Sequence, residues 1–420
     1  MESSTISPKS LIFDLYLQPS LLIVALYSTI VTIAFTAQQL LLAAYLDELG
    51  FILISGVIIS VYFLFWFIFG PIFGTLSDLH GRKFLLILAN CVSFVGFLGL
   101  VLVPDPLFLF VMNALLGFGA AIRVGSVIAL WVQHSPQDRI GESLGYNSIL
   151  LTVGGVGGAL IGVFMWTTIQ AQSFVILGIL LLVSAIPIIF ISDSGNYIPF
   201  SFETLLNVVH EKSNQKIFFS IPILQVSIHW LAFSTIVSFS TFIIPIIDRL
   251  SEEIPTGSGL QIPFYLSLFI LVALIVSCVG GLLFWGRISD LWARKPVLII
   301  GYAGTLLLIL SAMIFFLFDW FPILIDGLNS YDLLSIIIIG LFFPIIFFTA
   351  VSLVTTPTAW ISDIVGQEDL AKAMSLRQVL IGMGTVMGTL VGGFVIGTLG
   401  ISGLLLIILI LLVVSAVILI

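Results

Sequence analysis

The amino-acid sequence predicts an all-α membrane protein with twelve transmembrane helices in two pseudo-symmetric bundles of six. Composition is the first reason: 60% of the 420 residues are hydrophobic and only 8% are charged, whereas soluble domains contain roughly 25% charged residues. The apolar residues form long unbroken runs, which excludes the short alternating strands of a membrane β-barrel. A repeat relating the two halves of the chain is the third reason. Together they exclude a soluble enzyme, a nucleic-acid-binding protein and a disordered chain.

Twelve apolar runs are long enough to cross a bilayer as helices, which takes about 20 residues each. We expect these spans at residues 20–45, 51–76, 84–103, 107–131, 143–165, 173–192, 217–247, 262–286, 296–318, 333–358, 374–398 and 400–420. Because the number is even, both termini should lie on the same side of the membrane.

The distribution of lysine and arginine predicts which side this is. With the N-terminus inside, 11 of the 13 basic residues lie in inner segments, while Arg249 lies in an outer loop and Arg123 within a span. Cytoplasmic loops carry such an excess of basic residues. We therefore expect a plasma-membrane protein with both termini in the cytoplasm. The inner set is Lys9, Arg82, Lys83, Arg139, Lys212, Lys216, Arg287, Arg294, Lys295, Lys372 and Arg377.

The loops after the second and eighth spans contain the same motif. Residues 74–83 read GTLSDLHGRK and residues 286–295 read GRISDLWARK, with six of ten positions identical at an offset of 212. A second match, offset by 230, relates three glycines of the fifth span to three of the eleventh: Gly154, Gly158 and Gly162, and Gly384, Gly388 and Gly392. Two matches in the same order indicate a duplicated six-helix unit. We expect bundles at 1–192 and 217–420, joined by a cytoplasmic linker at 193–216.

The segment 74–83 fits, position by position, the signature loop Gly-x-x-x-Asp-x-x-Gly-Arg-Lys of the major facilitator superfamily, which the whole chain resembles. The copy at 286–295 differs only at Ala293, where the second glycine is expected. The resemblance implies two six-helix bundles that rock about a central cavity. It further implies a transporter of a small molecule rather than an enzyme, without cofactor, metal or nucleic-acid partner. We expect a monomer in the lipid bilayer, with protons as the candidate coupling ion.

Each residue type in the loop motif has a physical role. Gly74 and Gly286 allow a neighbouring helix to approach closely. Asp78 and Asp290 can cap a helix N-terminus or pair with a basic residue. An arginine in this loop requires a carboxylate at a nearby helix end.

The resemblance identifies that carboxylate in the second half as Asp363, whereas Gln133 occupies the matching position in the first half. The first-half contact should therefore be weaker. By resemblance, the motif residues hold the inner side closed when the outer side is open. The alternative is that the basic residues only anchor the loops on the cytoplasmic side. The residues concerned are Gly74, Asp78, Gly81, Arg82, Lys83, Gly286, Asp290, Arg294, Lys295 and Asp363.

Two further segments resemble motifs of the drug-efflux branch, each with a departure. The glycines Gly145, Gly154, Gly158 and Gly162 resemble its antiporter motif, but that motif has proline at Ala159 and glycine at Val163. The alternative is a stripe of small residues that lets helices pack closely, which also fits the matching glycines of the eleventh span. In the fourth span, Asn113 stands where proton antiporters carry an arginine.

Arg123 is the charged residue deepest in a span, about eight residues or roughly 12 Å from the inner end of its helix. A charge at such depth costs about 2.5–3.5 kcal/mol on insertion scales. It should therefore face the cavity, where it could bind an anionic substrate group or respond to a coupling proton. The alternative is a structural tether, snorkelling inward or pairing near Asp138 or Glu142.

His229 lies in the middle of the seventh span, with Gln225 one turn before it on the same face. A histidine in a wet cavity can titrate near neutral pH, although a buried histidine is more often simply hydrogen-bonded. Further polar candidates for the cavity are Gln38, Gln39 and Asn147. No Asp or Glu lies deep inside a span, so coupling would run through His229 or the carboxylates at 47–48, unless the protein is a uniporter.

These features predict a secondary transporter that exports amphiphilic or drug-like molecules by proton antiport and alternating access. A largely apolar, aromatic interior with few charges suits lipophilic cargo. The alternative is a uniporter or symporter of a small anionic metabolite that uses Arg123. A non-transporting receptor on the same fold would carry large soluble loops, which the sequence does not show.

Overall fold

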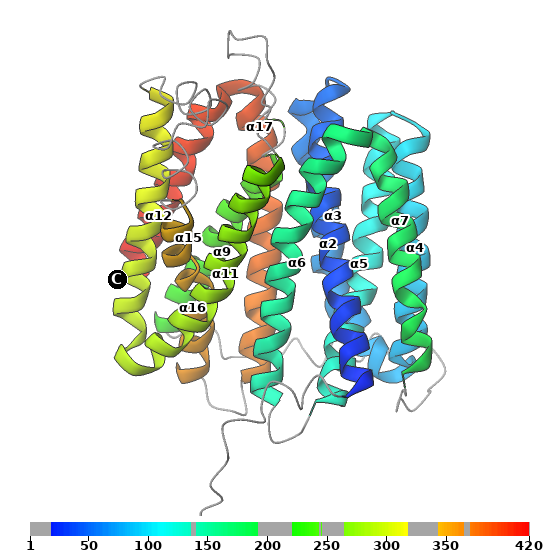
Figure 1. Ribbon diagram of the computed structural model, residues 1–420, viewed down its shortest axis with the longest axis horizontal. Helices are drawn as coiled ribbons and strands as arrows, with labels where there is room; N and C mark the ends of the chain where they lie inside the picture. Colours follow the sequence, from blue (N-terminus) through cyan, green and yellow to red (C-terminus); the bar gives the residue numbers. More distant parts are fainter. Residues whose placement is uncertain are drawn as a thin grey trace, which may run out of the picture.

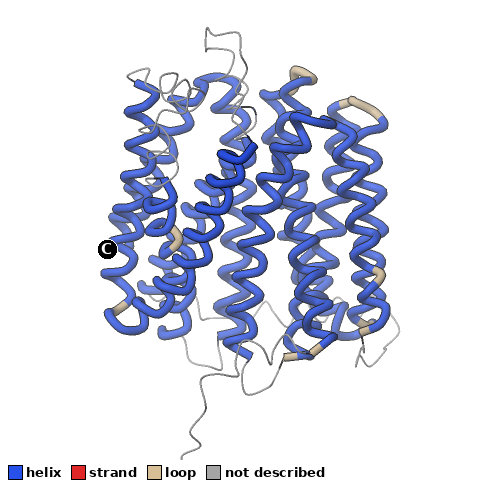
Figure 2. The backbone as a smooth tube through the Cα atoms, in the orientation of Figure 1, coloured by secondary structure: helices blue, strands red, loops and turns tan. Residues whose placement is uncertain are grey.

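The computed structural model describes residues 18–135, 140–191, 221–242, 245, 264–317, 343–364 and 370–419. Within these ranges the chain is almost entirely helical and contains no strand (Figure 2). The predicted all-α class is therefore confirmed.

In the described part of the first half there are six α-helices, each overlapping one predicted span. Phe108 N donates to the Asp105 carboxylate at 2.9 Å, which caps the helix that begins at Pro106. The elements are α2 (Pro19–Glu48), α3 (Ile52–His80), α4 (Arg82–Leu102), α5 (Pro106–His134), α6 (Ile140–Ile169), η2 (Gln170–Gln172), α7 (Ser173–Ala185) and η3 (Pro187–Phe190).

In the second half the predicted boundary between the last two spans coincides with a break in a helix. Gly400 has φ 67° and ψ −160°, a backbone conformation that glycine adopts and other residues disfavour. This residue divides α17 into two arms. The elements are α9 (Ile221–Ser238), η5 (Phe239–Phe242), α11 (Phe264–Trp292), α12 (Arg294–Leu317), α15 (Phe343–Ala350), α16 (Ser352–Ile364) and α17 (Leu370–Leu419).

Seven helical segments in the described residues are long and apolar enough to cross a membrane. Two of them run through two predicted spans each, Ile149–Phe190 and Leu380–Ile418. Three shorter apolar helices, Leu224–Ser238, Val276–Ser289 and Pro344–Val354, overlap further predicted spans. A multi-pass helical membrane protein follows, while the count of twelve remains a prediction.

The helices form two groups, α2–α7 in one and α9–α17 in the other (Figure 1). The predicted linker, 193–216, lies outside the described residues, so the domain boundaries remain a prediction. The two groups meet where α3 crosses α17: a Cβ added to Gly393 would lie 2.5 Å from Gly56 N, and one added to Gly397 would lie 2.6 Å from Leu53 Cδ2. Only glycine permits such close contact between helix backbones.

The largest buried apolar cluster also joins the two groups. It extends from the C-terminal half of α2, including Leu40 and Leu41, to Phe239, Phe242 and Val395. These residues lie toward the end of the molecule that carries the α2–α3 turn and the Gly400 break. The other described clusters each lie within one group.

The internal repeat is visible in how helices pack. The glycine stripes place α6 against α2 and α17 against α9, and two glycines of each stripe lie close to matching backbone carbonyls of the partner helix. The α2 residues that contact the α6 glycines and the α9 residues that contact the α17 glycines are 202 positions apart. This number is the repeat offset between α2 and α9. The four contacts are Gly154 with Thr29, Gly158 with Ile33, Gly384 with Leu231 and Gly388 with Thr235.

Candidate functional site

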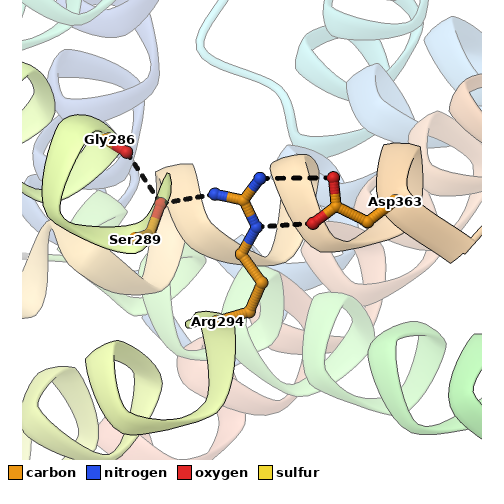
Figure 3. Close-up of polar contacts among 4 residues, drawn as sticks. All are labelled: Gly286, Ser289, Arg294 and Asp363. Carbon is orange, nitrogen blue, oxygen red and sulfur yellow. Dashed lines mark hydrogen bonds and ion pairs between the residues drawn. The ribbon is translucent and has the colours of Figure 1, made fainter. Parts of the chain in front are cut away.

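Arg294 and Asp363 form the ion pair that the loop motif predicts (Figure 3). Arg294 Nε lies 2.7 Å from Asp363 Oδ2, and Nη2 donates to Oδ1 at 3.2 Å, so the contact is bidentate. Nη1 donates to Ser289 Oγ at 2.8 Å, and that hydroxyl donates to the Gly286 carbonyl. Arg294 thereby joins the end of α11 to the end of α16.

The first half makes the equivalent contact with a neutral partner. Arg82 Nη1 donates to Gln133 Oε1 at 2.7 Å, joining the start of α4 to the end of α5. Arg82 and Arg294 are 212 positions apart, and Gln133 and Asp363 are 230 apart. The two loop–helix contacts are thus counterparts, and the first lacks the ionic component, as the sequence predicts.

The remaining basic residues of the two loops point to different partners. Lys83 Nζ donates to the Ile189 carbonyl at 2.6 Å, while Lys295 Nζ lies 5.8 Å from the centre of the Trp360 ring. The side chains of Asp78 and Asp290 and the packing around Gly74 lie outside the described part of the structure.

The single residue that links the two helices at each motif has a positive φ. Gly81, between α3 and α4, has φ 91°, and Ala293, between α11 and α12, has φ 135°. The signature glycine is therefore explained by backbone geometry, and Ala293 adopts a conformation that side chains disfavour.

The predicted glycines of the two stripes lie at helix contacts wherever they are described. At Gly286, by contrast, an added Cβ would meet no described atom within 4 Å, so the close helix approach expected there is not found. A Cβ at Gly162 would lie 3.1 Å from Ala37 Cα, and one at Gly392 would lie 2.7 Å from Phe242 Cε2. With the carbonyl contacts of Gly154, Gly158, Gly384 and Gly388, this geometry is that of a packing stripe. The side-chain surroundings of Gly145 are outside the described residues, and an antiporter role for the motif stays a prediction.

Arg123 lies in a buried polar centre of the first half, 2% exposed. Its Nε donates to Tyr27 Oη and Asn90 Oδ1, each at 3.2 Å, and Nη2 donates to Ser93 Oγ at 2.8 Å. Nη2 also donates to the Ala89 carbonyl, and the guanidinium lies 4.6 Å from the Phe35 ring centre. These neutral contacts tie α5 to α2 and α4. Asp138 is outside the described residues, as is the Glu142 side chain.

His229 lies in a matching centre of the second half, 1% exposed. Its Nε2 lies 3.0 Å from the Leu353 carbonyl, which can only accept, so Nε2 carries a proton. Nδ1 lies 2.5 Å from Tyr302 Oη, a hydroxyl that can donate or accept, and Tyr302 Oη in turn contacts Ser415 Oγ at 2.5 Å. The chain Ser415–Tyr302–His229–Leu353 joins α17, α12, α9 and α16 and gives both ring nitrogens a hydrogen-bond partner.

The two centres are related residue by residue through the repeat. The offset of 202 takes Tyr27 to position 229, 212 takes Asn90 to 302, and 230 takes Arg123 to 353. The sequence analysis did not predict the partners of Arg123 and His229, because single Tyr, Asn and Ser residues are common in membrane helices. These partners are Tyr27, Asn90, Tyr302 and Ser415. The offset from position 90 to position 302 is the one signal that could have singled them out.

The other predicted polar candidates are buried between helices. Asn113 Nδ2 donates to the Ile58 carbonyl at 2.7 Å, and its Oδ1 accepts from Gln38 Nε2 at 3.1 Å. Gln39 Nε2 donates to Gln38 Oε1 at 2.7 Å. This amide chain joins α5, α3 and α2 at the position where proton antiporters carry arginine.

Gln225 and Asn147 complete the predicted set. Gln225 Nε2 donates to the Ile418 carbonyl at 2.9 Å, so it shares with His229 a face turned toward the second arm of α17. Asn147 is 6% exposed, and its Oδ1 is buried without a hydrogen-bond partner.

Comparisons with known proteins agree with this arrangement. The chain is 24% identical over 349 residues to a "Multi-drug resistance efflux pump PmrA homolog" from Lactococcus lactis subsp. lactis (strain IL1403), covering 82% of this chain and 79% of that protein. It is 33% identical to the "Multidrug resistance protein MdtG" from Dickeya zeae (strain Ech586), but over 138 residues only, 31% of this chain and 32% of that one.

Two crystal structures share the fold at low sequence identity. A D-xylose-proton symporter has a TM-score of 0.69 at 13% identity, covering 96% of this chain and 97% of that one. The nucleoside transporter NupG has a TM-score of 0.67 at 14% identity, covering 95% and 98%. The sequence model of the Major Facilitator Superfamily matches residues 20–358 and 279–420. The chain is therefore a member of the major facilitator superfamily and a multi-pass membrane transporter, not an enzyme.

Proposed function

We propose that this protein exports small amphiphilic molecules from the cytoplasm by alternating access, in exchange for protons. The proposal rests most on the similarity to a protein named as a multidrug efflux pump homolog, which extends over 82% of the chain. The excess of lysine and arginine at one end of the helices supports an orientation with that end in the cytoplasm.

The contacts between the two helix groups support a rocking motion. The loop–helix contacts and the centres around Arg123 and His229 each lie within one group, so either group can move as a body. At the crossing of α3 and α17 the groups touch through glycines, backbone atoms and apolar side chains, and the Ser55 hydroxyl there donates within its own helix. A contact of this kind has no directional bond to break when the helices tilt.

The conformation in the structure fits a state that is closed on the outer side. The apolar cluster that joins the groups lies toward the α2–α3 turn, the outer end in the proposed orientation. Arg82, Lys83, Arg294 and Lys295 lie at the opposite end, where the described clusters do not join the groups.

His229 is the proposed proton-binding residue. Nε2 already donates to the Leu353 carbonyl, so Nδ1 is the atom that would take a proton, with the Tyr302 hydroxyl donating to the neutral ring and accepting from the protonated one. Asn113, at the position where proton antiporters carry an arginine, is neutral and cannot bind or release the coupling proton. The metabolite alternative through Arg123 has less support, because that guanidinium is 2% exposed and donates to neutral groups of its own half.

Transport into inverted membrane vesicles tests the proposal. Vesicles that contain the protein should accumulate the neutral dye N-phenyl-1-naphthylamine or the cation ethidium when a proton gradient is imposed, and collapse of the gradient with nigericin should abolish uptake. His229→Gln should leave the protein inserted but make any remaining transport insensitive to the gradient. Failure to accumulate either dye under a gradient would contradict the efflux proposal.

A further inference from the structure

Four buried polar atoms without a hydrogen-bond partner are related in pairs by the internal repeat. They are Ser28 Oγ, Asn147 Oδ1, Trp230 Nε1 and Arg377 Nε, among seven such atoms in the described structure. The offset of 202 takes Ser28 to Trp230, and the offset of 230 takes Asn147 to Arg377. Within the first half, Ser28 and Asn147 lie on α2 and α6, which pack together. Within the second half, Trp230 and Arg377 lie on α9 and α17, which also pack together.

An unpaired buried polar group costs about 1–3 kcal/mol, so such atoms are few and usually have a reason. Here four occur at matching places on the helices of both halves, although the residue types differ between the halves. Matching positions with different chemistry indicate that these places are open to different groups in the two halves, and the second-half pair carries the features of a binding site.

The second-half pair combines a charge with an aromatic surface. The Arg377 guanidinium lies 4.2 Å from the centre of the Trp230 ring. Stacking on an indole fixes the plane of a guanidinium while its N–H edge stays free for a bidentate acceptor. Arg377 makes no hydrogen bond or ion pair with the described residues, and it is half-buried rather than sealed. Trp230 is 2% exposed, and its Nε1 is a second unused donor.

The surroundings of this pair are apolar and cationic. Trp230 packs in a cluster with Val226, Phe233, Trp360, Leu380 and Ile381. Lys295 lies over the ring of Trp360 at 5.8 Å and adds a second positive charge to the same cluster. The carboxylate of Asp363, near the end of α16, is already bound to Arg294.

We propose that Arg377 and Trp230 bind the acidic group of an amphiphilic organic anion, such as an aromatic carboxylate or sulfonate. The acidic group accepts from the Arg377 edge and from Trp230 Nε1, and the apolar body packs beside Trp360, Leu380 and Ile381. The inference rests on the proposed function and specifies its substrate class. It also moves the anion-binding role from Arg123, whose donors are engaged within its own half, to Arg377.

Binding of two ligands that differ only in charge tests the assignment. Purified protein in lipid nanodiscs is equilibrated with 2-naphthoate or with the neutral 2-naphthamide, and affinity is measured by calorimetry. Arg377→Gln should weaken naphthoate about tenfold or more, because a charge-assisted bidentate contact is lost, and should change naphthamide less than about twofold. Arg377→Lys should fall between, since lysine keeps the charge without the fork.

Trp230→Phe should weaken naphthoate severalfold because it removes the Nε1 donor and keeps a ring under the guanidinium. Arg287→Gln is the matched control: this exposed arginine lies near the end of α11, and its loss should change neither affinity. Equal weakening of both ligands by Arg377→Gln, no weakening of either, or a wild type that binds naphthamide but not naphthoate would each overturn the assignment.

The proposed function is tested separately by N-phenyl-1-naphthylamine, which carries no charge. Gradient-driven export of this dye by the wild type, together with naphthoate binding that ignores Arg377, would leave the efflux proposal standing and remove the anion site. Naphthoate binding that depends on Arg377, without export of any dye, would keep the anion site and remove the efflux proposal.

Discussion

At the residue scale, the backbone of the loop motif makes a prediction about Ala293. One residue connects α11 to α12, and its φ of 135° is one that a Cβ disfavours, at a cost on the order of 1–2 kcal/mol. Ala293→Gly should therefore raise the thermal unfolding temperature in detergent by a few degrees. Gly81→Ala, the reciprocal change in the first half, should lower it. A less stable Ala293→Gly variant would show that the positive φ carries no strain.

The loop–helix contacts allow a second reciprocal exchange. Asp363→Gln gives the second half the neutral contact of the first, and Gln133→Asp gives the first half the ion pair of the second. Since Asp363 is 51% exposed, either change should alter stability by less than about 1 kcal/mol. Transport should slow severalfold in Asp363→Gln, because the contact acts on the closing motion more than on folding.

Vesicle transport rates, compared at equal protein content, check this prediction. Asp363→Ala, which leaves Arg294 without any acceptor at that position, should slow transport further than Asp363→Gln does. Rates that match the wild type in both variants would support the alternative in which the basic loop residues serve only as cytoplasmic anchors.

At the element scale, two adjacent glycines of α6 distinguish the effect of helix packing from the effect of helix propensity. A Cβ at Gly158 would lie 2.6 Å from the Ile33 carbonyl, whereas one at Gly157 would meet nothing within 4 Å. Gly158→Ala should therefore push α6 away from α2 and lower the unfolding temperature. Gly157→Ala should be neutral or slightly stabilising, because alanine is the better helix former by about 1 kcal/mol. Equal effects on thermal unfolding would contradict the packing stripe.

The helices themselves could be predicted from the sequence because hydropathy and the loop motif both act locally. The predicted spans overlap the observed helices, and the break at Gly400 falls between the last two spans. The pairing of Arg294 with Asp363 was also predictable, through resemblance. The partners of Arg123 and His229 were not: Tyr302 is 73 positions from His229 and meets it only because the fold brings side chains of α9 and α12 into one buried centre. Arg377 was assigned to an inner segment because the sequence does not show that it stacks on Trp230.

At the scale of the whole molecule, the two helix groups are expected to move as bodies about their shared contact. The duplication explains why: each unit carries its own polar centre, its own loop–helix contact and its own glycine stripe, so these contacts need no group from the other unit. Between the groups lie the α3–α17 crossing, a smaller contact of α6 with α11 and the apolar cluster toward the α2–α3 turn. Opening that end requires Leu53 to separate from Gly397, and this separation can be blocked.

A disulfide across the groups should therefore stop transport. In a background with Cys91→Ser and Cys278→Ala, the pair Leu53→Cys and Gly397→Cys can be oxidised, because a Cβ at Gly397 would lie 3.7 Å from Leu53 Cα. Oxidation should abolish dye accumulation in vesicles, and dithiothreitol should restore it. The matched control is Gly99→Cys with Met112→Cys, which links α4 to α5 within one group at a Cβ separation of 3.5 Å. This second crosslink should leave transport unchanged, since rigid bodies tolerate internal bonds. Transport that persists across the Leu53–Gly397 crosslink would mean that the outer contact does not open, and the rocking mechanism would fail.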